Sequence, residues 1–284
     1  MTRWGAQLAL TLCAFASAAH GAQISAQRLK TTRCSLPRVP AAARCGVLRA
    51  LENPAAPRGR RLAIHFAVLP ALSPRHRNDP LVLMMGGPGE DAISDAADAA
   101  SQFIDLRGDR DILLVDQRGA GQSAPLRCKL FSPEDPSASV IDLFPTKSVA
   151  ACARELESRT DLTRYTYDYA ARDLEQIRRG LGYGPFNLVA FSYGTRFAQV
   201  YMREYPRSVR TAYLGSVVPI DLAIPLTFAR AAQAALINYS MTARRTLLVM
   251  LPSRKYDKTP PQCSRSSQAT ESACGWWADL NRQC

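Results

Sequence analysis

Two spacings of apolar residues alternate along this chain. Four segments carry the short apolar runs or the strict apolar–polar alternation of strands, namely 61–69, 81–85, 111–115 and 209–218. Helical spacing marks four other segments, 91–103, 149–156, 167–181 and 226–236. Strands that alternate with helices in this way predict a parallel sheet with helices on both faces.

The sharpest change of pattern lies at a serine. An apolar run that includes Phe186 and Leu188 leads into Ser192, and helical spacing resumes at Phe197. A strand, a one-residue serine apex and a helix make up the layout of a nucleophile elbow, usually G-x-S-x-G. Here Ala190 replaces the first glycine and Gly194 is the second. Taken alone, the pentapeptide is equally consistent with a buried serine in an ordinary strand–helix turn.

Glycine-rich loops follow two of the other predicted strands. Residues 86–89 read Gly-Gly-Pro-Gly, and residues 116–123 read Asp-Gln-Arg-Gly-Ala-Gly-Gln-Ser. A serine nucleophile needs backbone N–H donors for the oxyanion, one from the residue after the serine and one from an earlier loop. Tyr193 and Gly87 are the candidate donors, since a turn without Cβ atoms can approach a substrate carbonyl closely.

In this order, the three motifs resemble the proline iminopeptidase and tripeptidyl-aminopeptidase branch of the α/β-hydrolases. The resemblance extends over roughly residues 45–236 and implies an α/β-hydrolase fold with a cap, here incomplete at the C-terminus. It implies release of residues from the N-termini of peptide substrates, without metal or cofactor, with Ser192 as nucleophile and Gly87 and Tyr193 as oxyanion donors. The other motif residues are expected to be structural: Gly86, Pro88, Gly89, Asp116, Arg118, Gly119 and Gly194.

Two departures from the family surround the glycine loop. Met85 stands where family members often carry histidine, which removes a polar brace but no catalytic group. Glu90 and Asp91 follow the loop directly. They are candidates to pair with the α-ammonium of a substrate, although capping of the next helix is the favoured interpretation.

The general base is missing from the expected place. The order of the triad in this fold is Ser, then Asp or Glu, then His, but His20, His65 and His76 all precede Ser192. Asp221 could serve as an acid, but no histidine follows it. We therefore expect a C-terminally truncated, essentially inactive serine hydrolase. An esterase of the same fold and a non-catalytic remnant that binds peptides are the alternatives.

Residues 237–284 do not resemble a folded hydrolase. A reading frame that starts at the third base of each codon would permit text closer to the family, so a frameshift after about Leu236 is the favoured interpretation. A short natural chain with a basic tail is the alternative. The expected division is a signal peptide over 1–21, the hydrolase part over 22–236 and the tail over 237–284.

Charge and the N-terminus indicate the cellular setting. The net charge of +12 is concentrated in residues 28–61 and beyond residue 244, without the interleaved aromatic residues of a nucleic-acid surface, so no nucleic-acid partner is expected. Arg3 precedes an apolar run over 8–19 that ends in small residues, which is typical of a secretory signal peptide and too short to span a bilayer. The sequence thus predicts export to a bacterial periplasm or beyond, without stable membrane insertion.

Export makes the cysteines candidates for disulfides. Local pairing suggests that Cys34 joins Cys45 and that Cys128 joins Cys152. No C-x-x-C spacing occurs, so no zinc site is expected.

Overall fold

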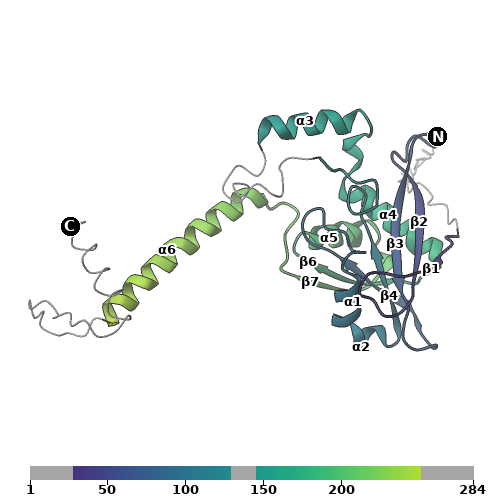
Figure 1. The fold of residues 1–284 in the computed structure, drawn as a ribbon, viewed down its shortest axis with the longest axis horizontal. Coiled ribbons are helices and arrows are strands. Elements are labelled where there is room, and N and C mark those ends of the chain that lie inside the picture. The colour runs from purple at the N-terminus through teal and green to yellow at the C-terminus, as the bar shows by residue number, and fades with distance from the viewer. Residues whose placement is uncertain (1–27, 129–144, 251–284) are drawn as a thin grey trace, which may run out of the picture. The chain divides into compact units, whose positions relative to one another are not determined.

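The computed structural model describes residues 28–128 and 145–250. The chain divides into two units, residues 1–221 and residues 222–284, and Figure 1 labels most of their helices and strands. The predicted signal peptide and the part of the predicted tail beyond residue 250 lie outside the described residues.

The first unit is built on a seven-stranded sheet in the order β1-β2-β3-β5-β4-β6-β7. Its strands are β1 (Thr32–Cys34), β2 (Ala43–Leu51), β3 (Arg61–Leu69), β4 (Arg77–Met84), β5 (Arg110–Val115), β6 (Phe186–Phe191) and β7 (Val209–Gly215). The pairs among β5, β4, β6 and β7 are parallel. The pairs that join β1, β2, β3 and β5 are antiparallel. The carboxyl ends of the parallel strands therefore meet at one edge, where all three predicted motifs begin.

Helices cover both faces of this sheet, as predicted. The helices of the first unit are α1 (Ala96–Gln102), α2 (Ile104–Arg107), α3 (Thr146–Glu157), α4 (Tyr167–Leu181) and α5 (Gly194–Glu204), with 3-10 turns η2 (Leu162–Arg164) and η3 (Pro206–Ser208). Side chains of α4 and α5 share one buried cluster with Val82 and Met84 of β4. Side chains of α1 share the other cluster with Leu81 and Leu83 of the same strand. Because successive side chains of a strand point to opposite faces, a central strand covered on both faces is apolar throughout.

Several boundaries differ from the sequence prediction. β1 and β2 lie before residue 61, in a Pro- and Arg-rich segment whose pattern predicted no strand. The helix expected over 91–103 begins only at Ala96, and the strand expected to reach residue 218 ends at Gly215. A turn at residues 92–95 precedes the helix, and a bend directly after Gly215 ends the strand.

Both expected disulfides are present. Cys34–Cys45 joins β1 to β2, and Cys128–Cys152 joins the segment after the β5 loop to α3. The Cα atoms are 5.8 Å apart in each, within the usual range for a disulfide.

The second unit contains one described element, α6 (Ile224–Met250). The sequence pattern predicted a helix over 226–236 only, and the observed helix continues past Leu236 for more than three turns. Within the described ranges, no helix combines the length and the apolar character needed to cross a bilayer.

Candidate active site

Ser192 directly follows β6, and with Tyr193 it forms the two-residue connection to α5. Its φ is +49°, a left-handed conformation that is uncommon for a residue with a side chain. Its N–H donates to the carbonyl of Gly215 over 3.0 Å. Its carbonyl accepts from the N–H of Thr195 over 3.0 Å and from the Thr195 hydroxyl over 2.6 Å. Bonds to β7 and to the first turn of α5 thus hold the strained serine at the apex of the turn.

Gly194 is required by the approach of two backbone segments. A Cβ atom at this position would lie 2.1 Å from the carbonyl oxygen of Met84 and 2.5 Å from that of Met85. The start of α5 therefore packs directly on the end of β4. Ala190, which replaces the first glycine of the usual motif, is fully buried and pairs in register with Met84 and Leu214. Its methyl group is accommodated in the core.

The Gly86–Gly89 loop leaves β4 beside Ser192. A Cβ atom on Gly86 would be 3.6 Å from the Cβ of Ser192. Gly87 has φ +97°, and a Cβ there would lie 2.9 Å from the backbone nitrogen of Gly89. Within the described residues, the N–H groups of Gly87 and Tyr193 have no hydrogen-bond acceptor. Both groups lie on segments that meet at Ser192, and neither is used in a hydrogen bond within the described residues.

Asp116 organises the loop after β5. Its side chain is buried and accepts from the N–H of Ile93 and from that of Gln122, each over 3.1 Å. Burial raises the pKa of Asp116 although both hydrogen bonds favour the carboxylate. Asp116 therefore connects its own loop to the segment before α1.

Arg118 forms a buried ion pair with Asp173 of α4. Its Nε and Nη2 donate to the two carboxylate oxygens, each over 2.8 Å, and Nη1 donates to the carbonyl of Arg164 over 2.8 Å. Burial raises the pKa of Asp173, and the guanidinium opposes that rise. The same guanidinium also donates to the carbonyl of Glu52 over 3.2 Å, so it connects α4 to the end of β2 as well as to η2. Gly119, at φ +92°, turns the chain directly after it.

A cavity of about 150 Å³ lies beside the glycine loop. Its lining comprises Gly86, Gly89, Glu90, Gln117, Arg118, Gly119, Ala120, Leu126, Tyr165, Thr166, Tyr167, Ala170 and Tyr193. The two acidic residues after the loop differ in what they do there. Asp91 accepts from the N–H of Ser94 over 2.9 Å and so stabilises the turn before α1. Glu90 is exposed, and no partner for its carboxylate lies among the described residues.

Tyr167 lies against Tyr193, with ring centroids 5.2 Å apart, and against Phe197 at 6.5 Å. Its hydroxyl oxygen is buried and has no hydrogen-bond partner within the described residues. Burial, followed by the neighbouring Tyr193, raises the pKa of Tyr167 far above the usual tyrosine value. The sequence pattern did not predict that Tyr167 lies against the elbow. Its place at the start of a helix gave no signal of contact with the elbow.

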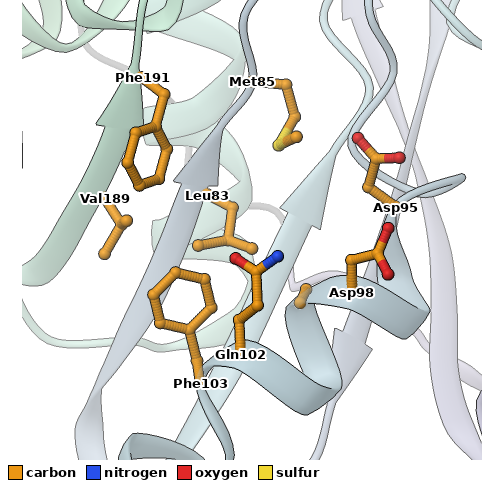
Figure 2. Close-up of a pocket in the computed structure, with 9 residues that line it drawn as sticks. Leu83, Met85, Asp95, Asp98, Gln102, Phe103, Val189 and Phe191 are labelled. Atoms are coloured by element: carbon orange, nitrogen blue, oxygen red, sulfur yellow. The ribbon is translucent and has the colours of Figure 1, made fainter. Parts of the chain in front are cut away.

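A second cavity, of about 180 Å³, lies on the face of the sheet that carries α1. Figure 2 shows Val189 and Phe191 of β6 facing Phe103 and Gln102 across Leu83. Met85 lines this cavity and is not part of the lining beside Glu90. Asp95 and Asp98 lie at its rim, and burial, then the charges of Asp98 and Asp91, raise the pKa of Asp95.

No histidine forms a hydrogen bond to the nucleophile within the described residues. His65 lies in β3. Its backbone N–H donates to the Ser123 hydroxyl over 2.8 Å, and its backbone carbonyl accepts from the N–H of Asp116. His76 is exposed at the residue before β4. The Ser192 hydroxyl makes no hydrogen bond to either, and Asp221 is exposed at the end of the first unit. The described ranges also contain no group of three His, Cys, Asp or Glu residues suited to a metal.

Several known hydrolases and peptidases are similar to part of this chain in sequence. YuaR of Escherichia coli, a presumed hydrolase, is 31% identical over 155 residues, or 54% of this chain and 30% of YuaR. The tripeptidyl aminopeptidase of Streptomyces coelicolor is 28% identical over 195 residues, which cover 63% of this chain and 36% of the relative. The serine protease Hip1 of Mycobacterium tuberculosis is 27% identical over 223 residues, which cover 72% of this chain and 42% of Hip1. The chain therefore spans less than half the length of these relatives.

The family model of the alpha/beta hydrolase fold matches residues 79–259, which include the glycine loop, the Asp116 loop and the serine elbow. This chain belongs to the alpha/beta hydrolase fold family.

Proposed function

We propose that this chain carries the nucleophile and oxyanion-binding part of an exported serine peptidase that acts at peptide N-termini. The observation that carries the proposal is the left-handed Ser192 at the apex of the turn, beside the unpaired N–H groups of Gly87 and Tyr193. The names of the relatives, tripeptidyl aminopeptidase and serine protease, support a peptide substrate.

In the proposed reaction, the oxygen of Ser192 attacks the carbonyl carbon of the scissile peptide bond. The hydroxyl proton passes to a base, and the carbonyl oxygen becomes an oxyanion that accepts from the N–H groups of Gly87 and Tyr193. Collapse of this intermediate breaks the C–N bond, and the amine leaves with the proton. Water then hydrolyses the acyl-serine.

We propose that the base in this scheme is a histidine encoded in a shifted frame after the Leu236 codon. Neither His65 nor His76 bonds to Ser192. A serine without its histidine retains only a small part of the catalytic rate of a complete triad. We accordingly propose that this chain, tested by itself, turns over peptides very slowly.

Export is the second part of the proposal. It is supported by the charged and apolar pattern of residues 1–21 and by the two disulfides of the first unit. Disulfides persist in oxidising compartments such as the periplasm and are rare in the bacterial cytosol.

Covalent labelling of Ser192 tests the proposed nucleophile. The folded chain, checked by circular dichroism, is treated with an uncharged alkyl fluorophosphonate, and the modified peptide is identified by mass spectrometry. Because the base is missing, we expect slow labelling at Ser192 on prolonged incubation, which Ser192→Ala abolishes, with little turnover of alanyl 4-nitroanilide. The absence of labelling in the folded protein would favour the non-catalytic remnant, and turnover of aryl esters without any turnover of anilides would favour an acyl hydrolase.

Sequencing the gene from the Leu236 codon onward tests the missing base separately. The proposal expects an open shifted frame that encodes an aspartate and then a histidine. A verified stop after Cys284 with no such frame would contradict it.

A further inference from the structure

From the position of Glu90 we infer that this carboxylate binds the α-ammonium group of the very residue whose carbonyl Ser192 attacks. The site would then release single N-terminal residues rather than tripeptides. This inference rests on the proposed function and specifies its substrate class.

The Glu90 carboxylate lies close to the nucleophile. Glu90 Oε2 lies 3.3 Å, and Ser192 Cβ lies 3.6 Å, from the position that a Cβ atom on Gly86 would occupy. The carboxylate and the nucleophile thus flank the same backbone position. The proposed oxyanion donor Gly87 is adjacent, and a Cβ there would be 3.5 Å from Glu90 Cγ.

The cavity next to the glycine loop carries a negative charge. Two charged side chains line the cavity next to the glycine loop, Glu90 and Arg118. Arg118 is neutralised by its two bonds to Asp173, whereas the Glu90 carboxylate has no partner among the described residues. The cavity therefore presents one uncompensated negative charge, which favours a cationic group of a ligand.

Part of the cavity wall is aromatic. Tyr165, Tyr167 and Tyr193 contribute to the lining. Aromatic rings attract cations through the negative potential of their faces, and they exclude water from an ion pair. An ammonium group next to Glu90 would thus be bound by a carboxylate in a partly apolar setting.

The length of the released fragment follows from these positions. In a single aminoacyl group, the α-nitrogen is separated from the scissile carbonyl carbon by one atom. In a tripeptidyl group it is two residues farther away, or roughly 7 Å in an extended chain. A carboxylate next to Gly86 is close enough to Ser192 for the first case and too close for an extended tripeptide.

Boronic acids provide the direct test, because boron accepts the serine oxygen and places the attached residue in the acyl position. Affinity is measured by calorimetry for 1-aminoethylboronic acid and for its N-acetyl form. The same pair is prepared for alanyl-alanyl-aminoethylboronic acid, whose free amine is two residues away. We expect the free amine of the short compound to raise affinity about tenfold, as a charge-assisted hydrogen bond does. The amine of the long compound should have no effect.

Variants assign the effect to one side chain. Glu90→Gln should abolish the preference for the free amine, and Glu157→Gln, which removes an exposed charge on α3, should preserve it. A preference that survives in Glu90→Gln, or an equal preference for the long free amine, would overturn the inference.

The N-acetyl compound separates the two proposals. Its binding needs Ser192 but no ammonium site, so binding that Ser192→Ala abolishes supports the nucleophile whatever Glu90 does. Ser192-dependent binding without any amine preference would overturn the assignment of Glu90 alone. Failure of all four compounds to bind would overturn both proposals.

Discussion

Gly194 and Met84 are in contact through their backbones, so that a Cβ on the glycine would lie 2.1 Å from the carbonyl oxygen of the methionine. This contact sets the start of α5 on the end of β4 and places Ser192 next to the loop that follows that strand. The position of the nucleophile therefore depends on a missing methyl group.

Replacement of Gly194 by alanine should destabilise the protein by several kcal/mol, because the clash is with backbone that cannot move without shifting β4. Urea unfolding followed by circular dichroism would measure the loss. Gly182→Ala is the matched control: Gly182 has φ +75° and no atom within 4 Å of an added Cβ. That variant should lose only about 1 kcal/mol, the cost of the left-handed conformation. Equal losses in the two variants would contradict the close contact.

Removal of the Arg118 charge should cost about 3–5 kcal/mol, since it leaves the buried carboxylate of Asp173 without a counter-charge. Arg118→Met measures this loss by urea unfolding. The double variant Arg118→Met with Asp173→Leu should recover much of the stability, because both charges are then absent. A double variant that is less stable than Arg118→Met would argue that Asp173 has another role.

Removal of the Tyr167 hydroxyl, which has no hydrogen-bond partner among the described residues, should not lower the stability, unlike the two substitutions above. Tyr167→Phe should leave the stability unchanged or raise it, because a buried hydroxyl without a partner opposes folding. Tyr201→Phe is the comparison, since its hydroxyl donates to Glu175 over 2.9 Å and its loss should cost about 1.5–3 kcal/mol. Thermal unfolding of both variants would measure the contrast. A loss above about 1 kcal/mol in Tyr167→Phe would mean that the hydroxyl has a partner in solution.

Glu175 should make stability depend on pH in acid. Burial alone would raise its pKa, but hydrogen bonds from Arg178, Arg179 and Tyr201 outweigh burial and hold the pKa below the ordinary value of 4.5. A lowered pKa in the folded state contributes stability above this ordinary pKa, and the contribution is lost as pH falls through the folded-state pKa.

The difference in unfolding free energy between the parent and Glu175→Gln isolates this effect. We expect the difference to be constant near neutral pH and to shrink below about pH 4. The raised pKa of Asp116 acts in the opposite direction but is common to both proteins. A difference that grows on acidification would contradict the assignment.

The fold class and the turn that holds Ser192 were predictable from sequence because local chemistry encodes them. Apolar runs identify the parallel strands, and glycines mark the loops where φ is positive, at Gly87, Gly89 and Gly119. The one-residue change from strand to helix identifies Ser192. The two disulfides were suggested by short separations along the chain, of 11 and 24 residues.

Only the tertiary structure decided which of the two neighbouring acids, Glu90 or Asp91, has a hydrogen-bond partner within the described residues. Glu90 and Asp91 are equivalent in sequence, and only the turn geometry assigns Asp91 to the N–H of Ser94. The pairing of Arg118 with Asp173 joins residues 55 positions apart, and the antiparallel β2 could not be recognised without β3 beside it. Local spacing determines backbone conformation, whereas burial and charge pairing depend on distant residues that meet only when the sheet and α4 are assembled.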